Sequence, residues 1–297
     1  MLTFSLICLE SMLLYMPLVL GAFVIFSLMK IPNISLETSF VTGAATASIM
    51  LTITRGCDPV VILIAAVAGA LLGGALIGAI TSFLVVFGKL PHLLAGILTI
   101  GIAYGLNLCL MGGSYVSLAG SQNSLALLPV GIHPELGVLI LLCGVLIMFI
   151  VLLLRTQLGL SFSVQGNNPH FFKNYGISSA YVVSIGLVFG NALAGLAGYC
   201  VAQTLGFVDI HAGAGMSLFC ITILIVGKAL IGKFCQRSVA LPMVGASVYV
   251  VLQQVLVRFG FGVKYFSVIQ ALIVIALVLV YYRQRSVAEL AGDHLGV

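Results

Sequence analysis

Residues 60–87 read VVILIAAVAGALLGGALIGAITSFLVVF, a stretch without a charged side chain that is long enough to cross a bilayer as a helix. Its four glycines, Gly69, Gly73, Gly74 and Gly78, form two interleaved GxxxG spacings, which let helices approach closely in lipid. Similar apolar runs lie at 5–29, 37–54, 92–111, 136–154, 181–203, 217–232, 239–258 and 265–282. The sequence therefore predicts an all-α polytopic membrane protein with about nine transmembrane helices, within a range of eight to ten.

The composition supports this class. Hydrophobic residues make up 62% of the 297 residues, charged residues only 6%, and the mean hydropathy is +1.28. Spans of about 20 residues each would use nearly the whole chain, so we expect residues 1–297 to form a single transmembrane domain. The seven cysteines are scattered without a CxxC pair, so neither a metal site nor a disulfide framework is expected.

The positive charges predict the orientation of the spans. If the amino terminus lies outside and the carboxyl terminus in the cytoplasm, nine of the twelve Lys and Arg residues fall on the cytoplasmic side. The first apolar run lacks the basic start and the cleavage site of a signal peptide, so we interpret it as the first span. The net charge of +5 then reflects this cytoplasmic bias, and no nucleic-acid partner is expected.

The most polar segment of the chain is RTQLGLSFSVQGNNPHFFKNYGISS, residues 155–179. In the predicted topology, residues 155–180 form a cytoplasmic loop. Within it, Asn167, Asn168 and Pro169 are typical of a helix start and Gly176 of a helix end, which predicts a short helix over 169–175. Two further loops, 112–135 and 203–216, are predicted on the outer side.

Catalysis by this chain is not expected. The five histidines are isolated, and the sequence holds no HExxH, no GxSxG and no P-loop for ATP. The polar residues expected at membrane depth are Glu10, Asn107, Asn191, Gln203, Lys228, Gln253 and Gln254. Mid-span Asn107 and Asn191 fit two interpretations, hydrogen bonds between helices or contacts with a transported ligand.

Several blocks in order resemble one protein family. They are MKIPNISLETSFVTGAATAS (29–48), GCDPVVILIAAVAGALLGGALIGAITSFL (56–84), LPHLLAGILTIGIAYGLNLCLMG (90–112), LGLSFSVQGNNPHFFKNYGIS (158–178) and FGNALAGLAGYCVAQTLGFVDIHAGAGM (189–216). Together they resemble permease subunits of bacterial ATP-binding-cassette (ABC) importers in the branched-chain amino-acid and ribose permease superfamily, most closely the tryptophan/tyrosine-type uptake branch. Two positions depart from that pattern, because Asn167 and Lys228 stand where acidic residues are usual.

The resemblance implies a multi-pass permease of the bacterial inner membrane that moves a small solute, an amino acid or a related compound. It implies P-loop ATPase subunits that use ATP and magnesium, an extracytoplasmic substrate-binding protein and a second permease copy, with no cofactor bound by this chain. The segment at 155–180 would carry a coupling helix against the ATPase. Its implied contact residues are Gly159, Gly166, Asn167, Asn168, Pro169, His170, Phe171, Lys173, Tyr175, Gly176 and Ile177.

The candidate pathway residues are Ser39, Thr42, Gly43, Asn107 and Asn191. The outer loops at 112–135 and 203–216 are candidates for receiving the binding protein. Two alternatives stay open, an ATP-independent secondary transporter or channel and a membrane scaffold without transport.

Overall fold

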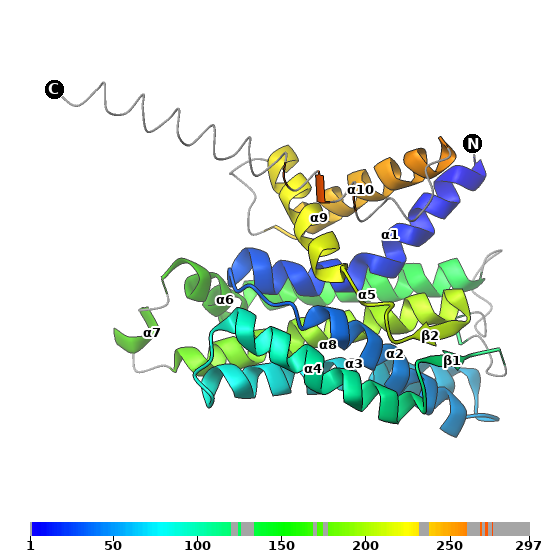
Figure 1. Cartoon of the computed structure of the whole chain (residues 1–297). Helices are drawn as coiled ribbons and strands as arrows, with labels where there is room; N and C mark the ends of the chain where they lie inside the picture. The colour runs from blue at the N-terminus through cyan, green and yellow to red at the C-terminus, as the bar shows by residue number, and fades with distance from the viewer. Residues whose placement is uncertain are drawn as a thin grey trace.

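The computed structural model describes residues 2–119, 124–125, 134–168, 171–174, 178–231 and 238–259, with isolated positions at 268, 271, 272 and 275. Its helices are α1 (Leu2–Ala22), the π-helical η1 (Phe23–Leu28), α2 (Leu36–Ile53), α3 (Pro59–Val86), α4 (His92–Met111), α5 (Pro134–Arg155), α6 (Gln157–Asn167), α7 (Phe171–Asn174), α8 (Ser179–Leu205), α9 (Met216–Ile231) and α10 (Ala240–Arg258) (Figure 1). Two short strands, β1 (Tyr115–Ser117) and β2 (Phe207–Asp209), complete the described elements.

The predicted class is confirmed. Within the described residues, seven helices are long and apolar enough to cross a membrane, and α9 is a shorter apolar helix. Each predicted run up to 239–258 coincides with one of these helices. The last predicted run, 265–282, lies almost wholly outside the described residues.

The structure differs from the sequence prediction in two places. Residues 157–167 form α6, where a loop was expected, because Phe162 and Ser163 give this polar stretch a buried face. The two loops predicted on the outer side contain β1 and β2, which pair antiparallel with Val116 opposite Val208. This pairing joins two loops that the sequence treats as separate.

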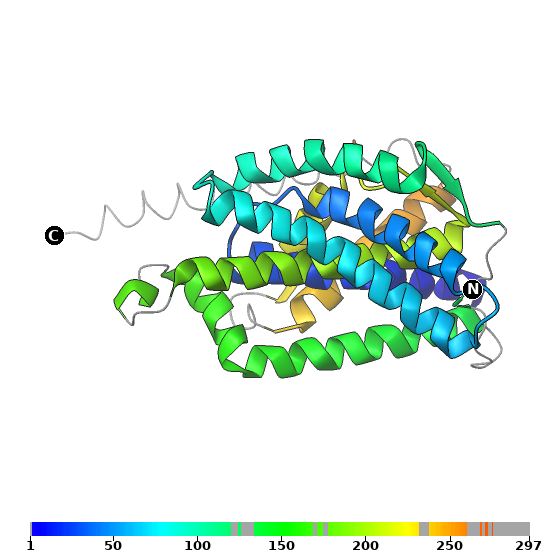
Figure 2. The same ribbon diagram turned by 90° about the horizontal axis from the view of Figure 1, so that it is seen from below.

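Helices α2, α3 and α8 meet through glycines, and we call these three helices the glycine-packed core. On α3, Gly69 and Gly73 face Met50 and Thr46 of α2, whereas the second pair of the interleaved spacings, Gly74 and Gly78, faces α8. In Figure 2, α3 crosses α8 at the centre of the molecule. The absence of side chains at both pairs therefore lets α3 pack closely against α2 and α8 together.

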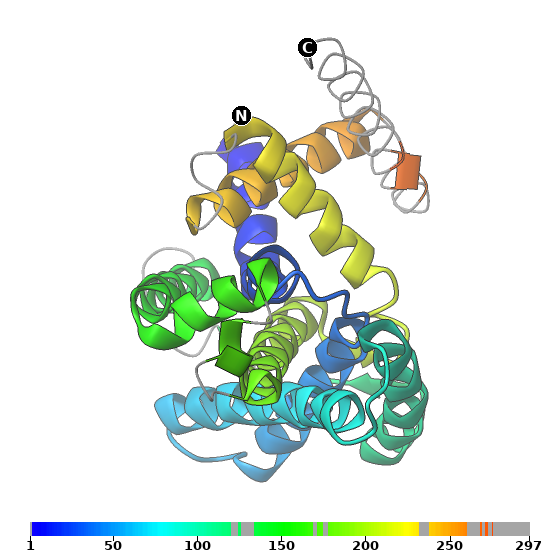
Figure 3. The same cartoon turned by 90° about the vertical axis from the view of Figure 1, so that its left-hand side faces the viewer.

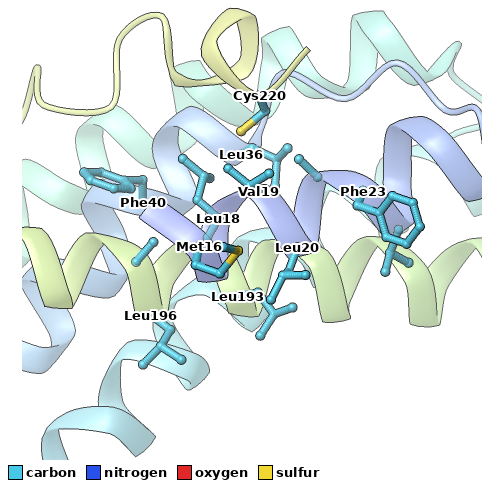
Figure 4. Packing of buried hydrophobic residues seen from close by; sticks show 14 of the residues in the cluster. Met16, Leu18, Val19, Leu20, Phe23, Leu36, Phe40, Leu193, Leu196 and Cys220 are labelled. Atoms are coloured by element: carbon cyan, nitrogen blue, oxygen red, sulfur yellow. The ribbon is translucent and has the colours of Figure 1, made fainter. Parts of the chain in front are cut away.

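Helix α1 links this core to the rest of the chain. Pro17 lies inside the helix, and a proline there removes a backbone hydrogen bond and bends the axis. The C-terminal part of α1 packs against α8, where Met16 and Leu20 are fully buried, and Phe23 at the start of η1 is fully buried as well (Figure 4). The N-terminal part leaves the core to lie with α9 and α10 (Figure 1).

Helices α9 and α10 form a hairpin beside α1, seen in Figure 3 on the opposite side of the molecule from α3. They are also glycine-packed, because Gly227 lies against the Leu241 carbonyl and Gly245 against the Ile223 carbonyl. Toward α1, however, the hairpin uses large side chains, as in the ring contact of Tyr15 with Phe219 at 5.1 Å.

Candidate functional site

Asn191 lies at the centre of a buried polar cluster between α2 and α8. Its Oδ1 accepts hydrogen bonds from Ser39 Oγ at 2.6 Å and Ser35 Oγ at 3.1 Å, and its Nδ2 donates to the Leu187 carbonyl at 2.8 Å. All of the polar atoms of this side chain are therefore paired within the protein.

Asn107 of α4 is held in the same way. Thr42 Oγ1 donates to Asn107 Oδ1 at 2.8 Å, and Asn107 Nδ2 lies 3.5 Å from Thr38 Oγ1. One residue along α2, Gly43 lies so close to Gly195 that a methyl group on it would overlap the α8 backbone.

The structure thus brings all five candidate pathway residues together along one face of α2. The four with polar side chains, Ser39, Thr42, Asn107 and Asn191, are each at most 1% exposed. Their hydrogen bonds join α2 to α4 and α8, as expected of polar residues that hold membrane helices together. Their part in a pathway stays a prediction.

Residues 29–35, the α1–α2 linker, run between η1 and α2 without helical structure. Lys30 has a positive φ of 55°, and Asn33 forms a turn in which its Oδ1 accepts from the Ser35 backbone N–H at 3.1 Å and from Ser35 Oγ at 2.7 Å. Since Ser35 also reaches Asn191, which is well inside α8, helix α2 begins within the bundle and not at its end.

Helix α9 begins at the same level. The Ser217 N–H donates to Glu37 Oε1 at 3.3 Å, and Ser217 Oγ donates to the Ile34 carbonyl at 3.4 Å. The Glu37 carboxylate thereby stabilises the positive end of the α9 dipole. The starts of α2 and α9 therefore lie side by side inside the protein.

A cavity of about 370 Å³ lies beside this junction. It is lined by Phe26, Lys30, Ile31, Pro32, Asn33, Ile34, Leu93, Ser217 and Ile221. Asn33 itself is 1% exposed, and its Nδ2 has no hydrogen-bond partner among the described residues.

Helix α6 contacts α5, α8 and η1, and one hydrogen bond also joins it to the linker. Gly166 lies against the Leu28 carbonyl, where a methyl group would overlap that oxygen, and Lys30 Nζ donates to Asn167 Oδ1 at 2.7 Å. Asn167, which stands where the family resemblance implies an acidic residue, thus binds Lys30 through an amide oxygen. The other departure, Lys228, lies in the last turn of α9, where a cation is favoured by the helix dipole.

The predicted ATPase contacts fall on both sides of the break between α6 and α7. Gly159 and Gly166 lie within α6, Asn167 is its last residue, and Asn168 is its C-terminal cap. In α7, Phe171 is 39% exposed and Phe172 is 2% exposed.

Lys173 lies in α7, without a described side chain. The remaining predicted contacts lie outside the described residues: Pro169, His170, Tyr175, Gly176 and Ile177. The extent of the predicted helix over 169–175 stays a prediction, because the described helix is Phe171–Asn174.

On the opposite end of the bundle, the β1–β2 ribbon joins the two loops that are predicted on the outer side. The rings of Tyr115 and Phe207 stack at 5.3 Å, and the Leu118 N–H donates to the Gly206 carbonyl at 2.9 Å. Gln203 also binds the first loop, since its Oε1 accepts from the Ser124 N–H at 3.1 Å. The described parts of both loops therefore form one surface.

Sequence reasoning missed Asn33, although the residue lies in a block that was used for the family resemblance. The available signal was the Pro32-Asn33 pair between two apolar runs, because proline and asparagine together favour a turn. No group of three metal-binding side chains occurs in the described part of the chain.

Among the described residues, seven candidate spans packed around a buried polar cluster form a multi-pass membrane protein. The family described as "Branched-chain amino acid transport system / permease component" matches residues 5–278, and the chain belongs to it. Its members are transport permease subunits, which places this chain in the bacterial inner membrane.

Several curated relatives are similar over much of their length. The chain is 31% identical over 233 residues to the "Tyrosine transport system permease protein" of Clostridioides difficile, covering 77% of this chain and 75% of the relative. It is 24% identical over 260 residues to the "Autoinducer 2 import system permease protein LsrC" of Escherichia coli O157:H7, covering 87% and 74%. No solved structure gives a significant match.

Proposed function

We propose that this chain is the permease subunit of an ATP-driven importer for a small solute, an amino acid or a related compound. P-loop ATPase subunits that use ATP and magnesium would bind its cytoplasmic face, and an extracytoplasmic binding protein would deliver the solute. Two copies of the chain would assemble around the ATPase pair. The amino-acid class is supported by the relative named for tyrosine transport.

The observation that carries this proposal is the contact of α6 with the end of η1 and with Lys30 of the α1–α2 linker. Helix α7 follows α6 closely and presents the exposed Phe171, while the buried Phe172 anchors it. A force applied to α7 would reach the end of η1 through Gly166 and the linker through the hydrogen bond from Lys30 to Asn167. ATP-driven movement at the cytoplasmic surface would therefore act on the start of α2, where the cavity lies.

The outer face offers a surface for the binding protein. The β1–β2 ribbon gives the described parts of the outer loops a fixed relative position, with Tyr115 56% exposed. A surface made from two loops held in register supports docking of a folded partner, because little order is lost when it binds.

The proposed topology places the amino terminus outside and α6 in the cytoplasm. Cys57, an exposed native cysteine in the turn between α2 and α3, then lies on the outer side. A membrane-impermeant maleimide added to intact spheroplasts is expected to label wild-type protein and not Cys57→Ser. Labelling that appears only after the membrane is broken would reverse the orientation.

The test of function is copurification of a P-loop ATPase with this chain, followed by ATP-dependent uptake in proteoliposomes. The Phe171→Asp variant is expected to copurify without the ATPase, because the substitution puts a charge on the apolar contact surface of α7. Phe87→Asp is the matched control, since Phe87 is 73% exposed beside the turn into α4. If no ATPase copurifies with the wild-type chain, the importer proposal fails in favour of an ATP-independent carrier or a scaffold.

A further inference from the structure

The N-terminal part of α1 and helix α10 lie beside each other and leave a groove between them (Figure 1). The groove has a volume of about 290 Å³, with Leu9 and Met12 of α1 on one wall and Val251 of α10 on the other. All of its lining residues lie within two candidate membrane spans, Phe4–Leu28 and Ala240–Arg258. The medium that reaches this groove is therefore the hydrocarbon of the bilayer and not water.

Small side chains create the groove. Ser5 and Cys8 line it from α1, and Ser247 lines it from α10. The two helices also touch directly, because Gln254 Nε2 donates to Ser11 Oγ at 3.4 Å. The groove is therefore a depression between two helices in contact and not a gap that separates them.

A positive charge lies at one end of the groove. Arg258, the last residue of α10, is exposed, and its guanidinium carbon lies 5.6 Å from the centroid of the Phe4 ring. Because Phe4 lines the groove, this cation–π contact holds the charge at the end of the groove. Glu10 of α1 does not line the groove. Since α10 ends at Arg258, the charge lies where the span meets the headgroup region of the bilayer.

These features are complementary to one class of molecule. The groove is mostly apolar along its length and cationic at one end, whereas a phospholipid is apolar along its acyl chains and anionic at its phosphate. From Phe4 to Met12, α1 rises by about 12 Å, which leaves room for part of one acyl chain. Arginine binds phosphate through paired hydrogen bonds, and basic residues beside membrane helices recognise anionic lipid headgroups.

We propose that this groove binds an anionic phospholipid, with one acyl chain between α1 and α10 and the phosphate on Arg258. In the proposed topology, this lipid lies in the outer leaflet. It joins the N-terminal part of α1 to α10 and so strengthens the attachment of the α9–α10 hairpin. The binding requires neither the ATPase nor the binding protein, so it does not depend on the importer assignment.

The test is lipid titration of the purified full-length chain, followed by native mass spectrometry. The probes are phosphatidylglycerol and phosphatidylcholine with the same palmitoyl and oleoyl chains, so that they differ only in the headgroup. The first phosphatidylglycerol is expected to bind about tenfold more tightly than the first phosphatidylcholine, because its net charge is negative.

The Arg258→Gln variant is expected to lose this preference, whereas Arg258→Lys, which keeps the charge, is expected to retain most of it. Arg155→Gln is the matched control and is expected to keep the full preference. Arg155 is likewise an exposed arginine at the last residue of its helix, but it does not line the groove.

The Ser247→Phe variant fills the groove and leaves Arg258 in place. It is expected to weaken the binding of both lipids about tenfold, because the acyl chain loses its position between the helices. Val248→Phe is the matched control, since Val248 is the next residue of α10, is 40% exposed and does not line the groove. This control is expected to bind both lipids as the wild type does.

A preference for phosphatidylglycerol that survives Arg258→Gln, or unchanged lipid binding by Ser247→Phe, would overturn the proposal. Another occupant of the groove would overturn it too. A dimer in lipid-free detergent that Ser247→Phe dissociates would place a second copy there. A disulfide between Cys8 and the cysteine of a Leu272→Cys variant would place residues 265–282 of the same chain there.

Discussion

The glycine-packed core and the α9–α10 hairpin are each held together by close backbone contacts. The hairpin, however, is joined to the rest of the molecule by side chains. Within the core, α3 packs against α2 through one pair of glycines and against α8 through another. The hairpin meets α1 through rings such as Phe219 and meets α2 through the hydrogen bond of Ser217 to Glu37.

This difference shows where the molecule resists displacement. Backbones in contact leave no room for sliding, because any shift brings main-chain atoms into collision. Side-chain contacts adapt by changing rotamers, so they allow two helices to pack in more than one way. The cavity is lined by the linker that leads into α2 and by residues of α9, so it lies between these two regions.

The largest effect is expected from Gly43→Leu in the core. The new side chain overlaps the backbone of Gly195, and neither α2 nor α8 can withdraw. We expect a loss of about 3 kcal/mol in the free energy of unfolding. Denaturant titration in detergent measures it, with Gly101→Leu on α4 as the control because nothing lies within 4 Å of that position. Equal losses for both variants would show that the close contact is not the cause.

A smaller loss, about 2 kcal/mol, is expected from Asn191→Leu, because Ser39 and Ser35 lose their shared acceptor. The double variant with Ser39→Ala is expected to lose less than the sum of the two single losses. The same unfolding assay measures all three variants. Strict additivity would mean that the hydrogen bond contributes nothing to joining α2 and α8.

A local effect is expected from Gly245→Val in the hairpin. The added methyl groups push α10 away from the Ile223 carbonyl, but α10 can shift without disturbing α3 or α8. We expect a loss of about 1 kcal/mol, with faster hydrogen exchange confined to α9 and α10. Faster exchange throughout α3 and α8 would contradict the separation of the two regions.

The smallest effect is expected from Glu37→Gln, which keeps an acceptor for the Ser217 N–H but removes the charge at the start of α9. The free energy of unfolding is expected to fall by about 0.5 kcal/mol. Glu10→Gln in α1 is the control and is expected to leave it unchanged. A larger loss than that of Asn191→Leu would show that the hairpin is joined to the core mainly by this charge.

Much of the fold could be predicted because hydrophobic spans and glycine spacing are local signals. The spacing of Gly69, Gly73, Gly74 and Gly78 predicted close helix contacts, and the structure shows which partner each pair faces. The spacing alone could not assign those partners, since a GxxxG pair does not specify what packs against it.

The features that were missed depend on contacts between distant segments. Helix α6 is polar in sequence and is stabilised partly where Gly166 meets Leu28, far away in the chain. Pairing of Val116 with Val208 likewise needs two loops that are separated by two spans, α5 and α8. Asn33 was passed over because a turn residue near a span end looks ordinary until its unpaired nitrogen and the neighbouring cavity are known.

The hydrogen bonds of Asn191 have a consequence for biosynthesis. The ribosome delivers α2 to the membrane well before α8, so Ser35 and Ser39 enter the bilayer before their shared acceptor has been made. During that interval, the Ser39 hydroxyl can only bond back to its own helix, at the Ser35 carbonyl. Arrival of α8 therefore supplies the acceptor that joins α2 to it, and a chain truncated before residue 179 keeps both hydroxyls on local acceptors, Asn33 Oδ1 for Ser35 and the Ser35 carbonyl for Ser39.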